Sequence, residues 1–240
     1  MTEVIHMDRN HWIMHQEWND LIFMHWPVPA EVLRPFIPPA FTIDEYDDSA
    51  WIAIVPFRIQ NIRFRTLPSL PFGNQLLELN VRTYVTFNGE PGVYFITLDA
   101  NHPLGVFLAR TLFGLPYVHA KMRMDQTEAG YQFTSRRIHK GYPASHFHAN
   151  FHTVSEPIHA QPGSLLYWLT ERYALWLVRG RSKIYKGPIL HKNWRLQKAE
   201  ADIHVNQLVD FLPPSLFATK PITYSSKSLH TKIFPFERKG

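Results

Sequence analysis

Apolar and polar residues alternate along much of the chain, and a period of two is typical of β-strands whose two faces meet different surroundings. Turn-forming residues separate the alternating segments. The pattern therefore predicts a mainly β fold. The predicted strands cover residues 51–59, 77–87, 93–99, 117–124 and 131–138.

Two of these strands are predicted to form a hairpin. The dipeptide Asn88-Gly89 lies between segments 77–87 and 93–99, and this pair favours the tight turns that join neighbouring strands. We therefore expect the two strands to pair in antiparallel fashion.

A helical period appears in three shorter segments, at residues 29–36, 103–113 and 164–178. In the second segment, Pro103 suits the first helical position and Gly114 suits the residue after the last turn. The third segment is predicted as one continuous helix. The fold class expected from these patterns is mainly β, of the α+β type, with a few helices.

The composition limits the class of protein. The chain has 240 residues, of which 45% are hydrophobic, and it has no cysteine. A chain of this length can bury most of its unfolded surface in one core, and no linker interrupts it, so we expect a single domain over residues 1–240. The absence of cysteine excludes disulfide scaffolds, thiolate nucleophiles and iron–sulfur sites.

The first residues contain acids and histidines instead of an apolar signal sequence, which predicts a cytoplasmic protein. The segment richest in apolar residues, 164–178, contains Glu171 and Arg172 and is too short to cross a bilayer. No membrane partner is expected.

Charge is unevenly distributed, although the formal net charge is only +5. Residues 1–120 hold 7 arginines and 12 acids, whereas residues 121–240 hold 18 basic residues and 8 acids. A basic half could contact nucleic acid, but no helix-turn-helix, finger or RNA-binding motif accompanies it. A solvated basic surface is the favoured interpretation, and a nucleic-acid partner is not expected.

Several kinds of chemistry lack their motifs. The chain has no nucleophile elbow, and Ser164 is better explained as the cap of the helix that follows it. It also has neither a phosphate-binding loop nor a dinucleotide fingerprint. We therefore expect no cofactor.

One histidine-rich segment invites a metal hypothesis. His146, His148 and His152 share one face of a possible strand, and imidazoles with a carboxylate suit zinc or non-haem iron. The nearest acid, Glu156, lies beyond the run. A solvent-facing strand is the alternative that we favour, so no metal is expected.

A row of polar residues is the strongest candidate site. Glu78, Asn80, Arg82 and Tyr84 alternate onto one strand face, opposite an apolar face. This polar row could line a pocket. Alternatively, Glu78 and Arg82 could form an ion pair that fixes strand register.

Several short blocks of sequence resemble the YqjF-like family of bacterial proteins, also called DUF2071. They occur in order between about residues 20 and 200. The blocks are His25-Trp26-Pro27-Val28, Val55-Pro56-Phe57-Arg58, Glu78-Leu79-Asn80-Val81-Arg82-Thr83-Tyr84-Val85, Gly92-Val93-Tyr94-Phe95, Leu98-Asp99-Ala100, Ala109-Arg110, Leu115-Pro116-Tyr117, Thr170-Glu171-Arg172-Tyr173 and His191-Lys192-Asn193-Trp194.

That family is regarded as a relative of acetoacetate decarboxylase, so the resemblance implies a closed antiparallel acetoacetate decarboxylase-like β-barrel with a few peripheral helices. In the decarboxylase, a lysine that follows a Gly-aromatic-Pro turn forms a Schiff base with a β-keto acid. The matching stretch here is Gly114-Leu115-Pro116-Tyr117. Tyr117 occupies the lysine position, which argues against the classical imine mechanism.

The candidate catalytic residues are Glu78, Tyr117 and Lys121. Glu78 resembles a glutamate that lines the decarboxylase cavity. Lys121 lies four residues beyond Tyr117 on the same strand face, with His119 and Arg123 as neighbours, and is either a relocated nucleophile or an exposed lysine.

The candidate substrate-binding residues are Arg58, Arg82 and Arg110, whose guanidinium groups could bind a carboxylate by a bidentate fork. Arg58 and Arg110 could equally clamp backbone carbonyl groups.

Two functions follow as hypotheses. The first is an enzyme that acts on a keto acid or related small carboxylate through Glu78, the arginines and Tyr117, by hydration, dehydration or aldol-type steps. The second is a non-catalytic protein that binds or senses a small molecule. A weaker third hypothesis is a basic surface that binds anionic polymers.

The high aromatic content also permits an apolar interface between copies of the chain, so a homo-oligomer is possible.

Overall fold

The computed structural model describes residues 11–68, 76–180 and 182–240, and this part of the chain is mainly β. Thirteen strands are joined by hydrogen bonds into one sheet. They are β1 (Met14–Val28), β2 (Thr42–Ile43), β3 (Ala50–Phe64), β4 (Leu76–Phe87), β5 (Glu90–Ala100), β6 (Tyr117–Thr127), β7 (Gly130–Arg137), β8 (His146–Thr153), β9 (Ala174–Arg179), β10 (Lys183–His191), β11 (Gln197–Asn206), β12 (Ile222–Ile233) and β13 (Glu237–Arg238).

The helices are few and short. The α-helices are α1 (Ala30–Leu33), α2 (Pro103–Leu112) and α3 (Leu165–Thr170), and the 3-10 helices are η1 (Arg34–Phe36) and η2 (Pro214–Phe217). Ser164 caps α3 as predicted, because its side-chain oxygen accepts a hydrogen bond from the Tyr167 amide at 3.2 Å. No helix in the described ranges is long and apolar enough to cross a membrane.

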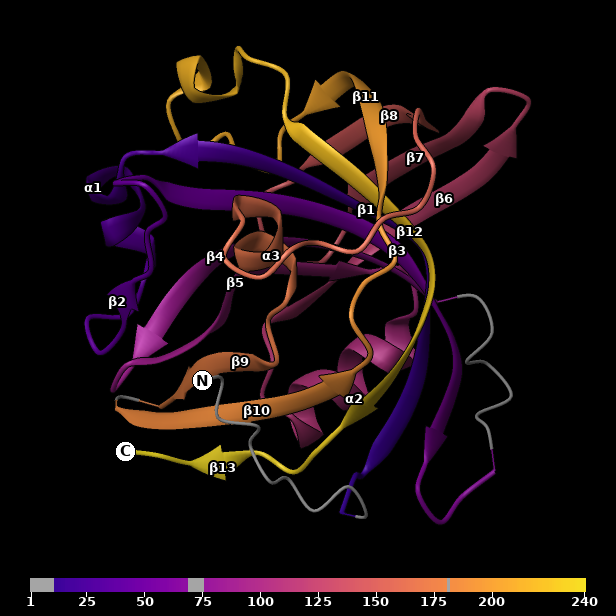
Figure 1. Cartoon of the computed structure of the whole chain (residues 1–240). Coiled ribbons are helices and arrows are strands. Elements are labelled where there is room, and N and C mark those ends of the chain that lie inside the picture. The colour runs from indigo at the N-terminus through magenta and orange to yellow at the C-terminus, as the bar shows by residue number, and fades with distance from the viewer. Residues whose placement is uncertain (1–10, 69–75, 181) are drawn as a thin grey trace.

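Strand pairing connects segments that lie far apart in the sequence. Starting from β5, the pairings run through β6, β7, β8, β11, β12, β1, β3 and β4 and return to β5. Figure 1 shows β6, β7, β8 and β11 together on one side of the molecule, with β9, β10 and β13 on the other. Strand β5 is parallel to β6 and to β9, whereas the other pairings are antiparallel.

The parallel pairing of β5 with β6 departs from the expected wholly antiparallel arrangement. Its cause is α2, which follows β5 and returns the chain to start β6 in the same direction. A parallel pair needs such a crossover.

The predicted hairpin is confirmed. Strands β4 and β5 pair in antiparallel register from Glu78 opposite Ala100 to Phe87 opposite Glu90. Asn88 and Gly89 have φ values of 51° and 78°. These left-handed conformations suit a two-residue turn, for which asparagine and glycine are the preferred residues.

The prediction of one helix over residues 164–178 is wrong. The helix α3 ends at Thr170, and residues Ala174–Arg179 form strand β9, which pairs with β10. Leu175, Trp176 and Leu177 are all buried, so this strand lacks alternation. A continuous apolar run fits a buried strand as well as a buried helix.

The two faces of β4 meet different surroundings. Leu77, Leu79 and Val81 pack into the largest buried cluster, together with residues from β1 and β3. The opposite face carries Glu78, Asn80 and Arg82 toward a second cluster, which includes Phe57 and Leu76, and toward a cavity. The predicted polar row therefore lies inside the molecule.

Candidate functional site

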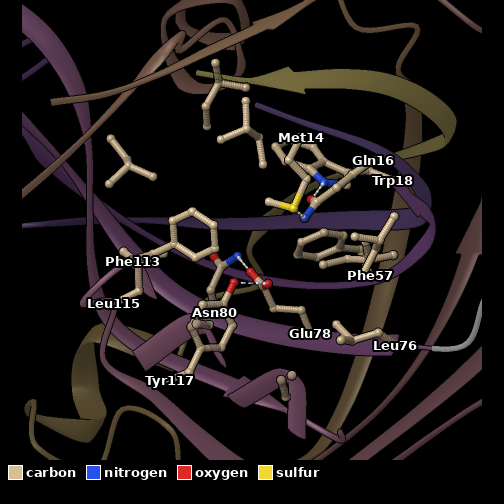
Figure 2. A pocket seen from close by; sticks show the side chains of 18 of the residues that line it. Met14, Gln16, Trp18, Phe57, Leu76, Glu78, Asn80, Phe113, Leu115 and Tyr117 are labelled. Atoms are coloured by element: carbon tan, nitrogen blue, oxygen red, sulfur yellow. Dashed lines mark hydrogen bonds between the residues drawn. The ribbon is translucent and has the colours of Figure 1, made fainter. Parts of the chain in front are cut away.

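A cavity of about 180 Å³ lies against the polar face of β4. Its walls come mainly from β1, β3, β4, β5 and α2, with single residues from β6, β9, β10 and β12 and a few from loops. Most lining side chains are apolar, including Trp18, Phe57 and Phe113, while Glu78 and Arg82 are the acidic and basic side chains among the described lining residues. Figure 2 shows Glu78 and Asn80 pointing into this apolar surrounding.

The spacing of the polar row follows from strand geometry. Glu78, Asn80 and Arg82 alternate on β4, so all three point to one side. At ~3.3 Å per residue, the Cα atoms of Glu78 and Arg82 are about 13 Å apart. The two side chains extend from separate positions on the strand, yet the charge of Arg82 still acts on Glu78.

The Glu78 carboxylate is held by two neutral donors. The Tyr117 hydroxyl donates to Oε2 at 2.6 Å, and the Asn80 amide donates to Oε1 at 3.1 Å. Both hydrogen bonds are drawn in Figure 2. Only 4% of Glu78 is exposed. Its carboxylate is thus fixed in position without a direct ion pair among the described residues.

Burial raises the pKa of Glu78 to about 7, and the hydrogen bonds from Tyr117 and Asn80 and the charge of Arg82 only partly oppose this shift. Burial also raises the pKa of the Tyr117 hydroxyl well above its ordinary value, and the adjacent Glu78 adds to the effect. Near neutral pH, Glu78 can therefore hold or release a proton while Tyr117 remains a donor.

Tyr117 begins β6 immediately after the turn that ends α2. Gly114 has a φ of 62°, which glycine adopts without strain, and the chain then turns toward β6. Arg110, in the last turn of α2, donates to the Tyr117 carbonyl at 2.7 Å and to the Tyr142 hydroxyl at 3.2 Å. Arg110 thus holds the backbone of Tyr117 and does not line the cavity.

Arg82 lies farther along the polar row. Its guanidinium carbon is 5.2 Å from the centre of the Phe23 ring and 5.8 Å from that of Tyr84. The Nε and Nη2 atoms are buried and have no hydrogen-bond partner among the described residues. This arginine therefore retains unused donors beside the cavity.

The other two predicted residues lie away from the cavity. Arg58 pairs with Asp20 at 3.4 Å. Lys121 is exposed, beside a shallow surface depression that Arg123 and Arg136 also line. The structure brings together Glu78, Tyr117 and Arg82, but not Arg58, Arg110 or Lys121.

Two contributions to the site were not predicted. Asn80 was placed on the polar face but was given no role, although its amide binds Glu78. Strand β1, which supplies Met14 and Trp18 to the wall, was not anticipated. Much of β1 is continuously buried, so its sequence lacks a clear alternation.

The histidine-rich segment forms strand β8. The His148 ring lies 4.7 Å from the ring of His204 on β11, and His152 is 3.7 Å from Glu200. Within the described ranges, no group of three or more histidine, aspartate or glutamate side chains could hold a metal ion.

Comparison with known proteins identifies relatives. The model of the DUF2071 family, described as an uncharacterized conserved protein, matches residues 15–230. The chain is 41% identical to the uncharacterized protein YqjF of Bacillus subtilis over 227 residues, which cover 95% of this chain and 93% of that protein.

Solved structures with a similar fold are acetoacetate decarboxylase-like. Acetoacetate decarboxylase from Legionella pneumophila superposes with a TM-score of 0.64 at 14% identity, covering 98% of this chain and 93% of that one. An acetoacetate decarboxylase-like enzyme from Sphingomonas wittichii gives 0.65 at 12% identity, covering 95% and 93%. The enduracididine biosynthesis enzyme MppR, complexed with pyruvate, gives 0.62 at 12% identity, covering 94% and 90%. At these identities the similarity shows the fold alone.

Proposed function

The chain belongs to the DUF2071 family, and on that premise we propose that it is an enzyme that transfers a proton on a small organic acid held in the cavity. The observation that supports this proposal is the environment of the Glu78 carboxylate and its effect on the pKa. Its carboxylate is buried in an apolar cavity, is oriented by Tyr117 and Asn80, and has its pKa raised to about 7. A general base works best when its pKa lies near the operating pH.

The proposed step begins with a substrate carbonyl placed near Tyr117. The Glu78 carboxylate takes a proton from the carbon next to the carbonyl, and the electron pair of the broken C–H bond moves to the carbonyl oxygen. The Tyr117 hydroxyl or the Asn80 amide then donates to this enolate oxygen. Protonated Glu78 can exchange its proton with solvent and return one to the carbon, which gives isotope exchange. Where the next carbon bears a hydroxyl, the enolate electrons form the C=C bond, the C–O bond breaks, and Glu78 gives its proton to the departing hydroxyl, which leaves as water.

This proposal does not use a Schiff base. No lysine is among the cavity-lining residues in the described part of the chain, and Tyr117 lies where the resemblance to the decarboxylase would place the lysine. MppR is complexed with pyruvate, which supports a carbonyl acid as the class of ligand. The continuous circuit of strand pairings supports a closed barrel around this ligand.

A carrier or sensor is the second candidate. The apolar lining and the existing hydrogen bonds to both Glu78 oxygens would also suit a protein that only binds. The two candidates differ in whether a bound acid exchanges its hydrogens.

Proton exchange in D₂O tests the proposal. Carbonyl acids would be incubated with the protein at pH 7, and loss of the C–H signal next to the carbonyl would be followed by NMR. We expect exchange in the native protein and a loss of about 100-fold or more in Glu78→Gln. Glu31→Gln, which changes an exposed glutamate on α1, is the matched control.

Persistent exchange in Glu78→Gln would contradict the proposed role of Glu78. Thermal stabilisation by the same acids without any exchange would support the carrier instead.

A further inference from the structure

The unused donors of Arg82 indicate what the cavity binds. The Nε and Nη2 atoms form one edge of a guanidinium group, and this edge binds a carboxylate through two parallel hydrogen bonds. In Arg82 both atoms are buried without a partner in the described structure. Leaving a buried charge unpaired is costly, so this position favours an anion.

The surroundings of Arg82 add positive charge. The Arg172 guanidinium carbon lies 5.0 Å from the centre of the same Tyr84 ring that Arg82 contacts. Arg172 is paired with Asp44 at 2.7 Å, but no described carboxylate forms an ion pair with Arg82. Arg82 lines the cavity, so its unpartnered donors are buried in this part of the wall.

The size of the cavity limits the ligand. An enclosed cavity of ~150 Å³ binds benzene. The cavity here measures about 180 Å³, so it can hold a body slightly larger than a benzene ring. Apart from Glu78 and Arg82, its lining is mostly apolar, with Asn80, Gln16 and the Tyr117 hydroxyl as polar groups.

The placement of the polar groups limits the orientation of the ligand. Glu78 and Arg82 are four residues apart on β4, and most of the side chains that line the cavity with them are apolar. A ligand whose carboxylate contacts Arg82 therefore places its apolar body along this lining, toward Glu78.

We infer that the cavity binds an amphipathic monocarboxylic acid whose carboxylate contacts Arg82 and whose apolar ring or chain extends toward Glu78. The inference deepens the proposed function and rests on it for the reaction, because a substrate must also carry a carbonyl group beside Glu78. It specifies an acid with an apolar ring or chain as the class of ligand.

Matched acids and alcohols test this inference in the intact protein. The probes are 3-phenylpropionate and octanoate, the corresponding alcohols 3-phenylpropan-1-ol and 1-octanol, and the short acids pyruvate and acetoacetate. Dissociation constants would be measured by calorimetry at pH 7. We expect each apolar acid to bind at least 10-fold more tightly than its alcohol and than either short acid.

Substitution of Arg82 should remove the preference for the acid. In Arg82→Gln, we expect the apolar acids to bind about 10- to 100-fold more weakly, because the hydrogen bonds between the guanidinium group and the carboxylate are lost. Binding of the alcohols should not change. Arg136→Gln, the control, removes a positive charge from an exposed position on β7 and should change neither the affinity for the apolar acids nor that for the alcohols. Arg82→Lys, which keeps the charge, should retain part of the preference if the glutamine variant does not fold.

Several results would overturn the inference. These are equal binding of acids and alcohols, tighter binding of pyruvate or acetoacetate, no binding of any probe, or an unchanged preference in the Arg82 variants. Binding of the apolar acids, with no exchange of any carbonyl acid, would leave this inference standing and refute the proposed catalysis. Exchange of carbonyl acids, with no binding of the apolar acids, would do the reverse.

Discussion

Two buried carboxylates in this protein have opposite surroundings. Asp99 is fully buried and receives two hydrogen bonds from Arg137, at 2.8 and 2.9 Å. Glu78 is nearly as buried, but its hydrogen-bond donors are the neutral side chains of Tyr117 and Asn80, and it borders a cavity. Burial raises the pKa of both carboxyl groups.

The two carboxylates differ in the side chains that donate hydrogen bonds to them. The Asp99 carboxylate is matched by a cation in bidentate geometry, which fixes its position and opposes the effect of burial on its pKa. The Glu78 carboxylate lacks such a cation, and its pKa lies near 7, so it can change protonation state. Buried carboxylates therefore serve structure or chemistry according to their partner, and burial alone does not tell them apart.

The largest expected effect comes from breaking the Asp99 pair. Asp99→Asn leaves the Arg137 guanidinium buried without its anion, which should cost about 3–5 kcal/mol in the free energy of unfolding. Urea denaturation measures this cost. Asp125→Asn, which disrupts an exposed pair with Arg123, should cost less than about 1 kcal/mol. Equal costs for the two variants would contradict the structural role of Asp99.

Glu78 should instead make stability fall as pH rises. Its pKa in the folded protein is about 7, above the ordinary 4.5, so the folded state binds the proton more tightly than the unfolded state. Its contribution is most favourable below about pH 4.5 and is lost as pH rises through 7, a change of about 3 kcal/mol.

The free energy of unfolding would be measured as a function of pH for the native protein and for Glu78→Gln. The difference between the two profiles isolates the contribution of Glu78, because the other titrating groups are common to both proteins. A difference that stays constant between pH 4 and 8 would show that the Glu78 pKa is not raised.

Tyr117 should stabilise only the ionised form of Glu78. Tyr117→Phe removes the donor at 2.6 Å and should cost about 2 kcal/mol at pH 8, where Glu78 is charged, and less at pH 5. Denaturation at the two pH values measures the difference. Tyr46→Phe, which removes an exposed hydrogen bond to the Gly163 carbonyl, should have a small effect that is the same at both. A cost of Tyr117→Phe that did not vary with pH would mean that Glu78 does not titrate in this range.

Part of the cavity lining could be predicted from the sequence. Strict alternation placed Glu78 and Arg82 on one face of β4, and the resemblance to the decarboxylase suggested Tyr117 as a candidate; all three line the cavity. Alternation shows which residues share a face, but not whether that face meets solvent, a core or a cavity. Only the packing of β4 against β1, β3 and α2 answers that question.

Other features could not be predicted because their signals are ambiguous. An arginine near a site can bind substrate or backbone, and Arg110 contacts the Tyr117 carbonyl while Arg82 lines the cavity. The apolar run after Thr170 suited either a helix or a strand, and the pairing of β9 with β10 determined the result. Such choices depend on contacts that are distant in sequence.

The proton affinity of Glu78 is the most direct test of the account. The protein would be labelled with ¹³C at glutamate carboxyl carbons, the Glu78 signal assigned by its absence from Glu78→Gln, and its chemical shift followed from pH 4 to 9. We predict a titration midpoint near 7. A midpoint near 4.5 would show that Glu78 is an ordinary ionised carboxylate and would contradict its role in proton transfer.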